Sequence, residues 1–424
     1  MRHSRAVDPY LHLPLPWCRR AALLVLMVLA LGSPVDAATW FVWNEAIDYC
    51  TDSATLTEIG PACTADAECS LCYDDSVPAE TNGVLCVLDE DCTVGGFTLC
   101  QTPGVCGGQA ATGSIQLPFD TIAAGMDAAS NGDTVQVLTG TYVEDVITKT
   151  GVSLVGSGSD VTTIDGLGNG PVVLFNFLSA DGAGDRLEGF KITGGGGRRG
   201  GGIRIIFGSP TITSNLITEN HVTVTTLGLP AGGGGIYVGD GSPFITGNVI
   251  EGNTVISDTL DPAKGGGIYI LRAVPFISNN IIRHNVVGEA PPGSGPDNGG
   301  NGGGIFTLAS NTTITRNLVC GNTAWVKKDL TSTYLFGYGG GLELQAGYPR
   351  VADNLIIGNS AGLGGAGIDI FLTGATVVNN TIHGNDVEAQ LLDLNAPAGF
   401  SHGGGMEIVN ATPTVFNNLI TSNR

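Results

Sequence analysis

Seven side chains recur at one fixed place in a repeated segment, and together they could bind charged or ring-shaped ligands. Each one directly follows the first aliphatic residue after a run of glycines. Side chains of a strand alternate between its two faces, so these seven are expected on the outer face of one sheet. In chain order they are Arg204, Tyr237, Tyr269, Phe306, Glu343, Asp369 and Glu407, and we call them the first column.

The last three members of the first column are carboxylic acids. Neighbouring strands lie about 4.8 Å apart, and like charges at that spacing raise each other's pKa unless a cation lies between them. Calcium prefers carboxylate oxygens as ligands. We therefore predict a metal site at Glu343, Asp369 and Glu407, with Ca²⁺ as the cofactor. The alternative is that these are ordinary solvated residues whose order has no meaning.

The aromatic members of the first column predict a carbohydrate site. Three adjacent rings would form a flat apolar platform of the kind that packs against the faces of sugar rings. A fourth aromatic residue belongs to the connector 323–338, which enters the same strand; it could instead cover a hydrophobic face of the solenoid. The predicted carbohydrate-binding residues are Tyr237, Tyr269, Phe306 and Trp325.

A repeated unit positions these residues. Relative to the aliphatic residue before each column member, asparagines recur at +12 and +17 in all seven units, while the distance between units varies from 26 to 38 residues. A fixed core with variable connectors is typical of a solenoid. The +12 positions are Asn215, Asn248, Asn280, Asn317, Asn354, Asn380 and Asn418, and the +17 positions are Asn220, Asn253, Asn285, Asn322, Asn359, Asn385 and Asn423.

Each unit is expected to form three short strands without a hairpin. The runs are short, β-branched and bounded by glycine, which favours strands over helices. Three strands per turn predict an all-β fold of parallel stacked coils, a β-helix. The repeated asparagines should sit at tight turns in the left-handed conformation and hydrogen-bond to each other as ladders.

The chain before the repeats divides into three parts. Residues 1–37 are predicted to be a signal peptide, because Arg19 and Arg20 precede the apolar run Ala21–Gly32, which is too short to span a membrane. Residues 38–110 contain eight cysteines, predicted to form a small disulfide-rich module; a zinc site at Cys69 and Cys72 is the alternative. Cys320 is expected to stay unpaired.

Residues 111–200 are expected to hold the N-terminal cap and first coils, followed by seven repeat units in 201–424. The helical spacing of Phe119–Ala129 predicts a capping helix, before Gly132–Val135 (GDTV), Gly140–Glu144 (GTYVE) and the Ile164-Asp165-Gly166 segment. This order resembles the N-terminal region of the pectin-lyase-like superfamily. The resemblance implies a right-handed parallel β-helix, with the substrate cleft on the strand that carries the first column. The repeats also resemble those of polymorphic outer-membrane proteins.

Three functions remain open. The first is a secreted or cell-surface protein that binds polysaccharide along the first column, the second a calcium-assisted polysaccharide lyase or hydrolase, and the third an adhesin-like structural passenger. The N-T-D, G-H-G, W-I-D-H and L-G-R-P-W motifs of related enzymes are absent, so the sequence does not decide whether this is an enzyme. A net charge of −21 excludes nucleic acid as a partner. Self-association, or contact with a further chain, is expected at an uncapped C-terminal coil.

Overall fold

The structure is a computed structural model, and it describes residues 38–42, 70–73, 84–86, 99–100, 118–176, 185–224, 231–257, 262–288, 299–325, 337–387 and 403–424. The predicted signal peptide lies outside these residues, as does the predicted disulfide pairing of residues 50–106. Three strands of the cysteine-rich segment form a small antiparallel sheet: β2 (Ser70–Tyr73), β3 (Val84–Cys86) and β4 (Leu99–Cys100).

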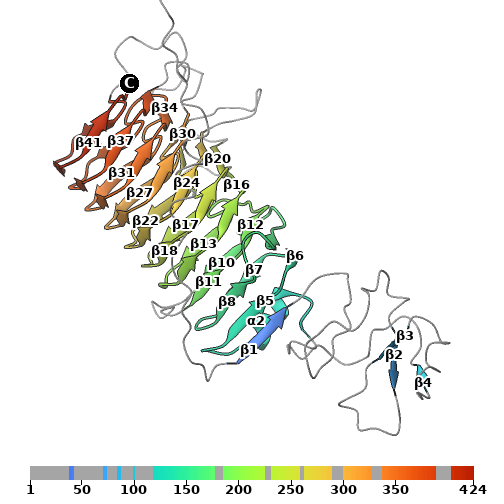
Figure 1. The fold of residues 1–424 in the computed structure, drawn as a ribbon. Coiled ribbons are helices and arrows are strands. Elements are labelled where there is room, and N and C mark those ends of the chain that lie inside the picture. The colour runs from blue at the N-terminus through green and yellow to red at the C-terminus, as the bar shows by residue number, and fades with distance from the viewer. Residues whose placement is uncertain are drawn as a thin grey trace, which may run out of the picture.

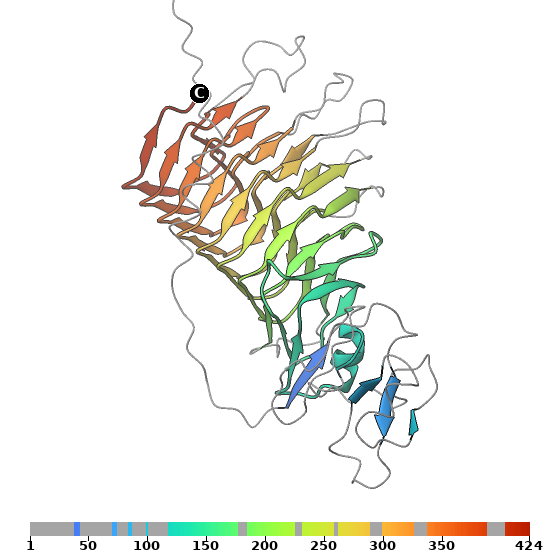
Figure 2. The same cartoon turned by 45° about the vertical axis from the view of Figure 1, so that its right-hand side comes forward.

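The remaining strands wind into a parallel β-helix, as the sequence predicts. Strands of successive coils lie side by side from the N-terminal cap to the C-terminus (Figures 1 and 2). The nine-stranded sheet, called here the first-strand sheet, carries the first column and consists of β7 (Val146–Ile147), β10 (Val173–Asn176), β13 (Ile203–Ile206), β17 (Ile236–Gly239), β22 (Ile268–Leu271), β27 (Ile305–Ser310), β31 (Leu342–Gly347), β35 (Ile368–Phe371) and β39 (Met406–Val409).

Two further long sheets complete the predicted three strands per coil. The second-strand sheet consists of β1 (Thr39–Val42), β5 (Thr134–Val137), β8 (Ser153–Gly156), β11 (Arg186–Glu188), β14 (Thr211–Thr213), β18 (Phe244–Thr246), β23 (Phe276–Ser278), β28 (Thr313–Thr315), β32 (Arg350–Ala352), β36 (Thr376–Val378) and β40 (Thr414–Phe416). The third-strand sheet consists of β6 (Gly140–Val143), β9 (Thr162–Asp165), β12 (Lys191–Thr193), β15 (Leu216–Thr218), β19 (Val249–Glu251), β24 (Ile281–Arg283), β29 (Leu318–Cys320), β33 (Leu355–Ile357), β37 (Thr381–His383) and β41 (Leu419–Thr421).

A fourth strand, which the sequence analysis did not predict, follows the second asparagine of most units. Its residues place one more aliphatic or alanine side chain inward, such as Val255, before the connector begins. The strands are β16 (His221–Val224), β20 (Thr254–Ser257), β25 (Val286–Val287), β30 (Thr323–Ala324), β34 (Ser360–Ala361) and β38 (Asp386–Val387). Two short strands inside connectors, β21 (Ala263–Lys264) and β26 (Gly300–Asn301), also pair.

One continuous apolar core runs along the axis of the solenoid. Each of the first six repeat coils contributes an inward aliphatic residue from each of its three main strands, and these residues are fully buried; Ile236, Ile245 and Ile250 belong to one such coil. Each coil therefore covers the apolar faces of its two neighbours, and burial of these side chains is the main favourable term in stacking.

The predicted capping helix is α2 (Ile122–Ala128). Thr121 accepts a hydrogen bond from the Ala124 N–H at 3.2 Å, and the carboxylate of Glu144 accepts from Ile122 N and Ala123 N at 2.8 and 3.0 Å. Ile122 and Met126 are buried in the core of the first coil. The helix therefore closes the N-terminal end, and its free N–H groups are satisfied by side chains.

One boundary differs from the sequence analysis. Thr39–Val42, expected within the cysteine-rich module, forms strand β1 and pairs in parallel with β5. Its alternating pattern puts Val42 into the core beside Ile122, and the Trp40 indole N–H donates to Asp133 Oδ2 at 3.0 Å. The solenoid therefore begins before the cysteines, which form an insertion between β1 and the capping helix.

Both asparagine ladders form as predicted. In each, the backbone N–H and the Nδ2 of one asparagine donate to the Oδ1 of the asparagine in the next coil, as from Asn285 to Asn322 at 3.1 and 3.0 Å. Asn322 in turn donates to Asn359 at 3.0 Å by both groups. Asparagines of the interior rungs are buried, so each turn of the solenoid is fixed by charge-neutral, fully paired amides.

The asparagines themselves do not adopt the left-handed conformation that the sequence analysis assigned to them. The residue before each asparagine has the positive φ instead, for example Ser214 at 56° before Asn215 and Glu219 at 56° before Asn220. The residue before each asparagine makes the tight turn. The asparagine side chain can therefore point along the axis of the solenoid, toward the next coil. The expectation about the asparagine backbone was therefore wrong, although the ladder is confirmed.

The last described coil has its inward side chains exposed. Val415 and Ile420 are 38% and 47% exposed, whereas Val377 and Ile382 at the same places one coil earlier are fully buried. Self-association at this coil stays a prediction.

Interior rungs should contribute more to stability than the last one. Asn322→Ala removes the acceptor for two buried N–H groups of Asn285 and the donor to Ile282 O, and each such unsatisfied buried group costs about 1–3 kcal/mol. We expect Asn322→Ala to lower the free energy of unfolding by at least ~3 kcal/mol. Asn423→Ala, at the half-exposed last rung, should cost ~1 kcal/mol. Urea unfolding followed by circular dichroism measures both; equal losses would contradict this account of the ladder.

Candidate functional site

The seven residues of the first column occupy consecutive places on the first-strand sheet. Parallel pairing aligns Arg204 with Tyr237, Tyr237 with Tyr269, Tyr269 with Phe306, Phe306 with Glu343, Glu343 with Asp369 and Asp369 with Glu407. The predicted register is therefore confirmed. On the N-terminal side the column continues with Leu174.

The column is not an open surface. Tyr269 and Phe306 have no exposed area, Tyr237 is 2% exposed, and Glu343 and Asp369 are each 3% exposed. Only the two ends, Arg204 and Glu407, are half-buried. Something other than the first-strand sheet must therefore cover its outer face.

The aromatic rings pack edge to face and not as a flat platform. The rings of Tyr237 and Tyr269 have centroids 5.3 Å apart at an interplanar angle of 81°, and those of Tyr269 and Phe306 are 5.3 Å apart at 74°. This is a favoured geometry for rings that interact with each other. With Leu271 they form a small buried apolar cluster outside the main core. The prediction of an exposed flat platform was wrong; whether these residues contact a ligand stays a prediction.

A second row of residues lies beside the first column. We call it the flanking column, and its members precede those of the first column by five residues: Arg199, Gly232, Lys264, Asn301, Tyr338 and Gly364. Neighbouring members pair through backbone bridges, Arg199 with Gly232, Lys264 with Asn301 and Tyr338 with Gly364. Sequence analysis missed this row, although its constant five-residue offset could have revealed it.

Members of the flanking column reach the first-column residue of the next coil. Arg199 Cζ lies 5.2 Å from the centroid of the Tyr237 ring, and Lys264 Nζ lies 5.9 Å from that of Phe306. Asn301 Nδ2 donates to Glu343 Oε1 at 3.4 Å. These contacts cover part of the first column from one coil earlier, and cation–π contacts over the rings add to its stability.

A glycine between the two columns makes this arrangement possible. The glycine that directly follows each flanking-column residue has a positive φ, such as 60° at Gly265 and 70° at Gly302. A Cβ at Gly265 would lie 2.3 Å from Ile268 O, and one at Gly302 would lie 2.7 Å from Ile305 O. Other residues would therefore be strained here, and the glycine lets the chain turn sharply from the flanking column into the first-strand sheet.

The three carboxylic acids form the C-terminal end of the site. Burial, and then the charge of Asp369, raise the pKa of Glu343 well above its usual value. Burial, and then the charge of Glu407, raise the pKa of Asp369 to about 8. Glu343 Oε2 and Asp369 Oδ1 are buried and accept no hydrogen bond. Asp369 is therefore expected to keep its proton at neutral pH unless a cation replaces it, and burial disfavours the ionised form of Glu343 as well.

Two neighbours of these acids come from the flanking column. Lys264 acts against the rise in the pKa of Glu343. Burial raises the pKa of Tyr338 to about 12, and the charges of Glu407, Asp369 and Glu343 add to this rise. Asn301 Oδ1 accepts from the backbone N–H of Gly337 at 3.1 Å and thereby holds the start of this segment beside Glu343.

The predicted calcium site at the three acids stays a prediction. Within the described ranges, no group of three or more histidine, cysteine, aspartate or glutamate side chains is arranged to hold a metal. The buried oxygens of Glu343 and Asp369 that lack partners would suit either bound protons or a cation.

Two other residues singled out in the sequence do not belong to either column. Trp325 is half-buried at the start of its connector, where its carbonyl accepts from Gly300 N at 3.0 Å. Cys320 is buried among aliphatic side chains on the outer face of the third-strand sheet and is disulfide-bonded, so the prediction of an unpaired thiol was wrong.

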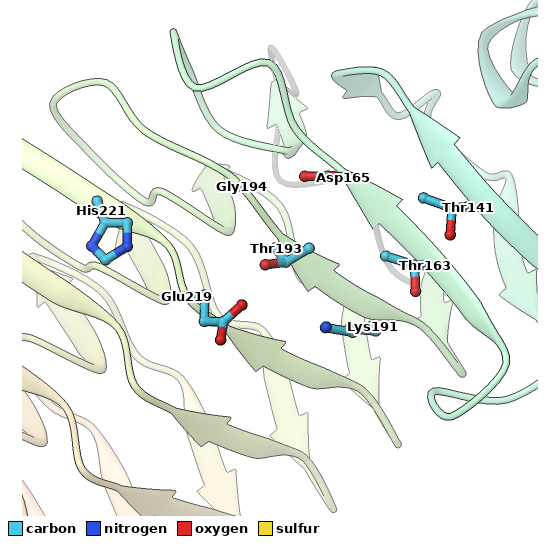
Figure 3. Close-up of a pocket in the computed structure, with 8 residues that line it drawn as sticks. All are labelled: Thr141, Thr163, Asp165, Lys191, Thr193, Gly194, Glu219 and His221. Carbon is cyan, nitrogen blue, oxygen red and sulfur yellow. The ribbon is translucent and has the colours of Figure 1, made fainter.

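An open depression of about 670 Å³ lies on the outer face of the third-strand sheet (Figure 3). Thr141, Thr163 and Lys191 form one row across strands β6, β9 and β12. The depression combines one amine with two carboxylates, but none of the predicted site residues contributes to it. Its lining is Thr141, Thr163, Asp165, Lys191, Thr193, Gly194, Glu219 and His221.

Residues 176–424 match the family model described as the right handed beta helix region. This chain belongs to that family. A comparison of this β-helix with curated protein sequences gives no match.

Several solved structures are similar to this β-helix at low identity. Pectate lyase Pel9A shares 16% identity over 75% of this chain and 77% of its own, with a TM-score of 0.41. A pectin methylesterase from carrot shares 12% over 68% and 84%, with a TM-score of 0.34. The catalytic domain of a GH87 α-1,3-glucanase shares 11% over 88% and 85%, with a TM-score of 0.33.

Among the described residues of this β-helix, no helix has the length and apolar character needed to cross a membrane.

The raised pKa of Asp369 predicts that stability falls as pH rises. Between its ordinary value of 3.8 and about 8, the unfolded chain is ionised at this residue while the folded chain keeps the proton. Folding then takes up a proton, so the free energy of unfolding decreases by about 1.4 kcal/mol per pH unit until the folded group also ionises near pH 8. Asp369→Asn should weaken this decrease and make the protein more stable than the wild type at pH 8–9.

Thermal unfolding from pH 4 to 9 measures the effect. Asp353→Asn is the matched control, because it removes the same carboxyl group from an exposed turn. Parallel pH profiles for the wild type and Asp369→Asn would show that Asp369 ionises normally.

Proposed function

We propose that this chain is a secreted or cell-surface β-helix protein that binds a polysaccharide along the outer face of the first-strand sheet. The observation that carries the proposal is the pair of aligned columns, which place polar and charged groups along seven consecutive coils. A polymer has a repeated structure of its own, and such an array can contact several of its residues at once. The signal peptide predicted for residues 1–37 supports a location outside the cell.

The half-buried members of the two columns are the ones that would contact such a ligand directly. These are Arg199, Arg204, Lys264, Tyr338 and Glu407, together with Trp325 at the edge of the site. Tyr237, Tyr269 and Phe306 would then support the flanking column from beneath. A sugar ring would reach them only if the flanking column moved aside, so their contribution to binding is indirect in this conformation.

Calcium at Glu343, Asp369 and Glu407 remains part of the proposal. Its support is that Glu343 Oε2 and Asp369 Oδ1 are buried without hydrogen-bond partners. Because ionised carboxylates are the calcium ligands, binding would have to displace protons from the two acids. Calcium affinity should therefore increase with pH up to about 8, the pKa of Asp369.

An enzymatic function is the second candidate, and it rests on the same acids. A carboxyl group that keeps its proton near neutral pH can act as a general acid toward a glycosidic oxygen or an adjacent leaving group. Asp369 fits this role by its pKa, whereas the burial of its side chain requires that the cover open to admit substrate.

Calorimetric titration with a panel of polymers tests the binding function. The panel comprises polygalacturonate, alginate and a neutral glucan, each with calcium and with EDTA. We expect one polymer to bind, and Asp369→Asn to weaken binding at least tenfold if calcium takes part, while Asp353→Asn leaves it unchanged. Absence of binding to all polymers would refute the proposal.

The same mixtures test for an enzyme. New absorbance from carbon–carbon double bonds would indicate a lyase, and new reducing ends without that absorbance a hydrolase. Either activity should be lost in Asp369→Asn. Stable binding without either product would leave a binding protein only.

A further inference from the structure

Three arginines gather at the N-terminal end of the first-strand face, in a chain whose net charge is −21. Arg198 and Arg199 precede the glycine turn, and Arg204 is the first residue of the first column. Their charges act on each other, since Arg199 and Arg198 both lower the pKa of Arg204. Three cations so close together in an acidic protein require an explanation.

Arg204 is held in unfavourable surroundings. It lies between Leu174 and Tyr237 in the column, and its Nε is buried without a hydrogen-bond partner. Burial is the largest cause of its lowered pKa, ahead of repulsion by the other two arginines. A guanidinium group that loses water and gains no partner costs free energy, and nearby positive charge increases that cost.

Elsewhere the fold supplies such partners. Arg272 makes a salt bridge with Asp240 at 3.0 Å, Arg283 pairs with Glu251, and Arg186 pairs with Glu188. Within the described part of the chain, neither Arg198 nor Arg204 has a carboxylate partner. Arg198 and Arg204 differ from the three paired arginines in position, because they lie at the end of the proposed binding face.

The backbone holds the arginines in place before any ligand binds. Arg199 forms a parallel bridge with Gly232, whose N–H donates to Arg198 O at 3.1 Å. Gly200 N in turn donates to Gly232 O at 3.0 Å. The Tyr237 ring lies under Arg199, with its centroid 5.2 Å from Cζ. A site that is already ordered loses little entropy when it binds.

We propose that Arg198, Arg199 and Arg204 bind an oxyanion, a carboxylate or a sulfate group carried by the ligand. The planar guanidinium fork matches such groups through two parallel hydrogen bonds, and the anion would supply the missing partner of Arg204. This inference rests on the proposed function and narrows it to acidic polysaccharides.

The two ends of the site then differ in charge. Arg204 and Glu343 are four coil steps apart, roughly 19 Å at the usual strand spacing. An acidic chain would be attracted at the arginine end and repelled at the acid end, unless those acids stay protonated or hold a cation. The binding face is therefore expected to favour one direction of the polymer.

The first test uses small anions and thermal unfolding of the whole protein. Sulfate or galacturonate at millimolar concentration should raise the unfolding temperature of the wild type more than chloride does at equal ionic strength. Arg204→Gln should abolish this rise and Arg198→Gln should reduce it. Arg350→Gln, which removes one exposed positive charge from the second-strand sheet, should leave it unchanged. An equal rise in all four proteins would overturn the proposal.

The second test separates the anion site from polymer binding. If polygalacturonate binds the wild type, Arg204→Gln should weaken that affinity at least tenfold, and a fully methyl-esterified polymer should bind both proteins equally. Unchanged affinity for polygalacturonate in Arg204→Gln and Arg198→Gln would refute the anion site while the proposed function stood. A response to small anions without binding of any polymer would support the anion site and refute the proposed function.

Discussion

The alignment of one coil with the next is the constraint on which the rest of the structure depends. It is fixed twice in every interior coil by buried amides, because each ladder asparagine donates two hydrogen bonds to a single oxygen of the next. A slip of one residue would leave these donors unsatisfied inside the protein and turn every inward aliphatic side chain outward. The connectors can therefore differ in length while both columns stay aligned, and the candidate site inherits its geometry from the ladders.

Most of the fold could be predicted from the sequence because it follows from periodicity. The asparagines at fixed offsets of twelve and seventeen residues predicted the ladders, and the aliphatic residues before the first column predicted the core. The pattern did not reveal which residue makes each tight turn. Ser214 and Glu219 take the left-handed conformation because they are exposed and leave Asn215 and Asn220 free to pair. The fourth strand was missed because its two to four residues are too few to show a period.

The candidate site could be predicted only in part. The register along the first column followed from the repeat. The burial of the first column did not, because it depends in part on the flanking column, whose side chains reach from one coil to the next. Lys264 and Asn301 precede the column by five residues and belong to the glycine-rich entry, which resembles a linker in sequence. Their contacts with Phe306 and Glu343 help to turn an expected open surface into a covered one. The burial of Glu343 raises its pKa, although Lys264 acts against that rise. The burial of the first column results from contacts between neighbouring coils, so it cannot be predicted from the sequence of a single unit.

The ladders also have a direction. Each Oδ1 accepts from the coil before it, beginning with the N–H groups of Phe190 and Gly195, and each ladder asparagine except the last in its ladder donates its backbone N–H and Nδ2 to the Oδ1 of the next coil. The Nδ2 also donates back to a carbonyl of the coil before, as from Asn215 to Leu187. The two faces of a coil therefore present different ladder groups, so the contact between coils is of the head-to-tail kind. Any unit of this form can follow any other without a new interface being invented. Duplication or loss of a whole unit would lengthen or shorten the solenoid and leave the remaining contacts intact, whereas a fraction of a unit could not be inserted at the same cost.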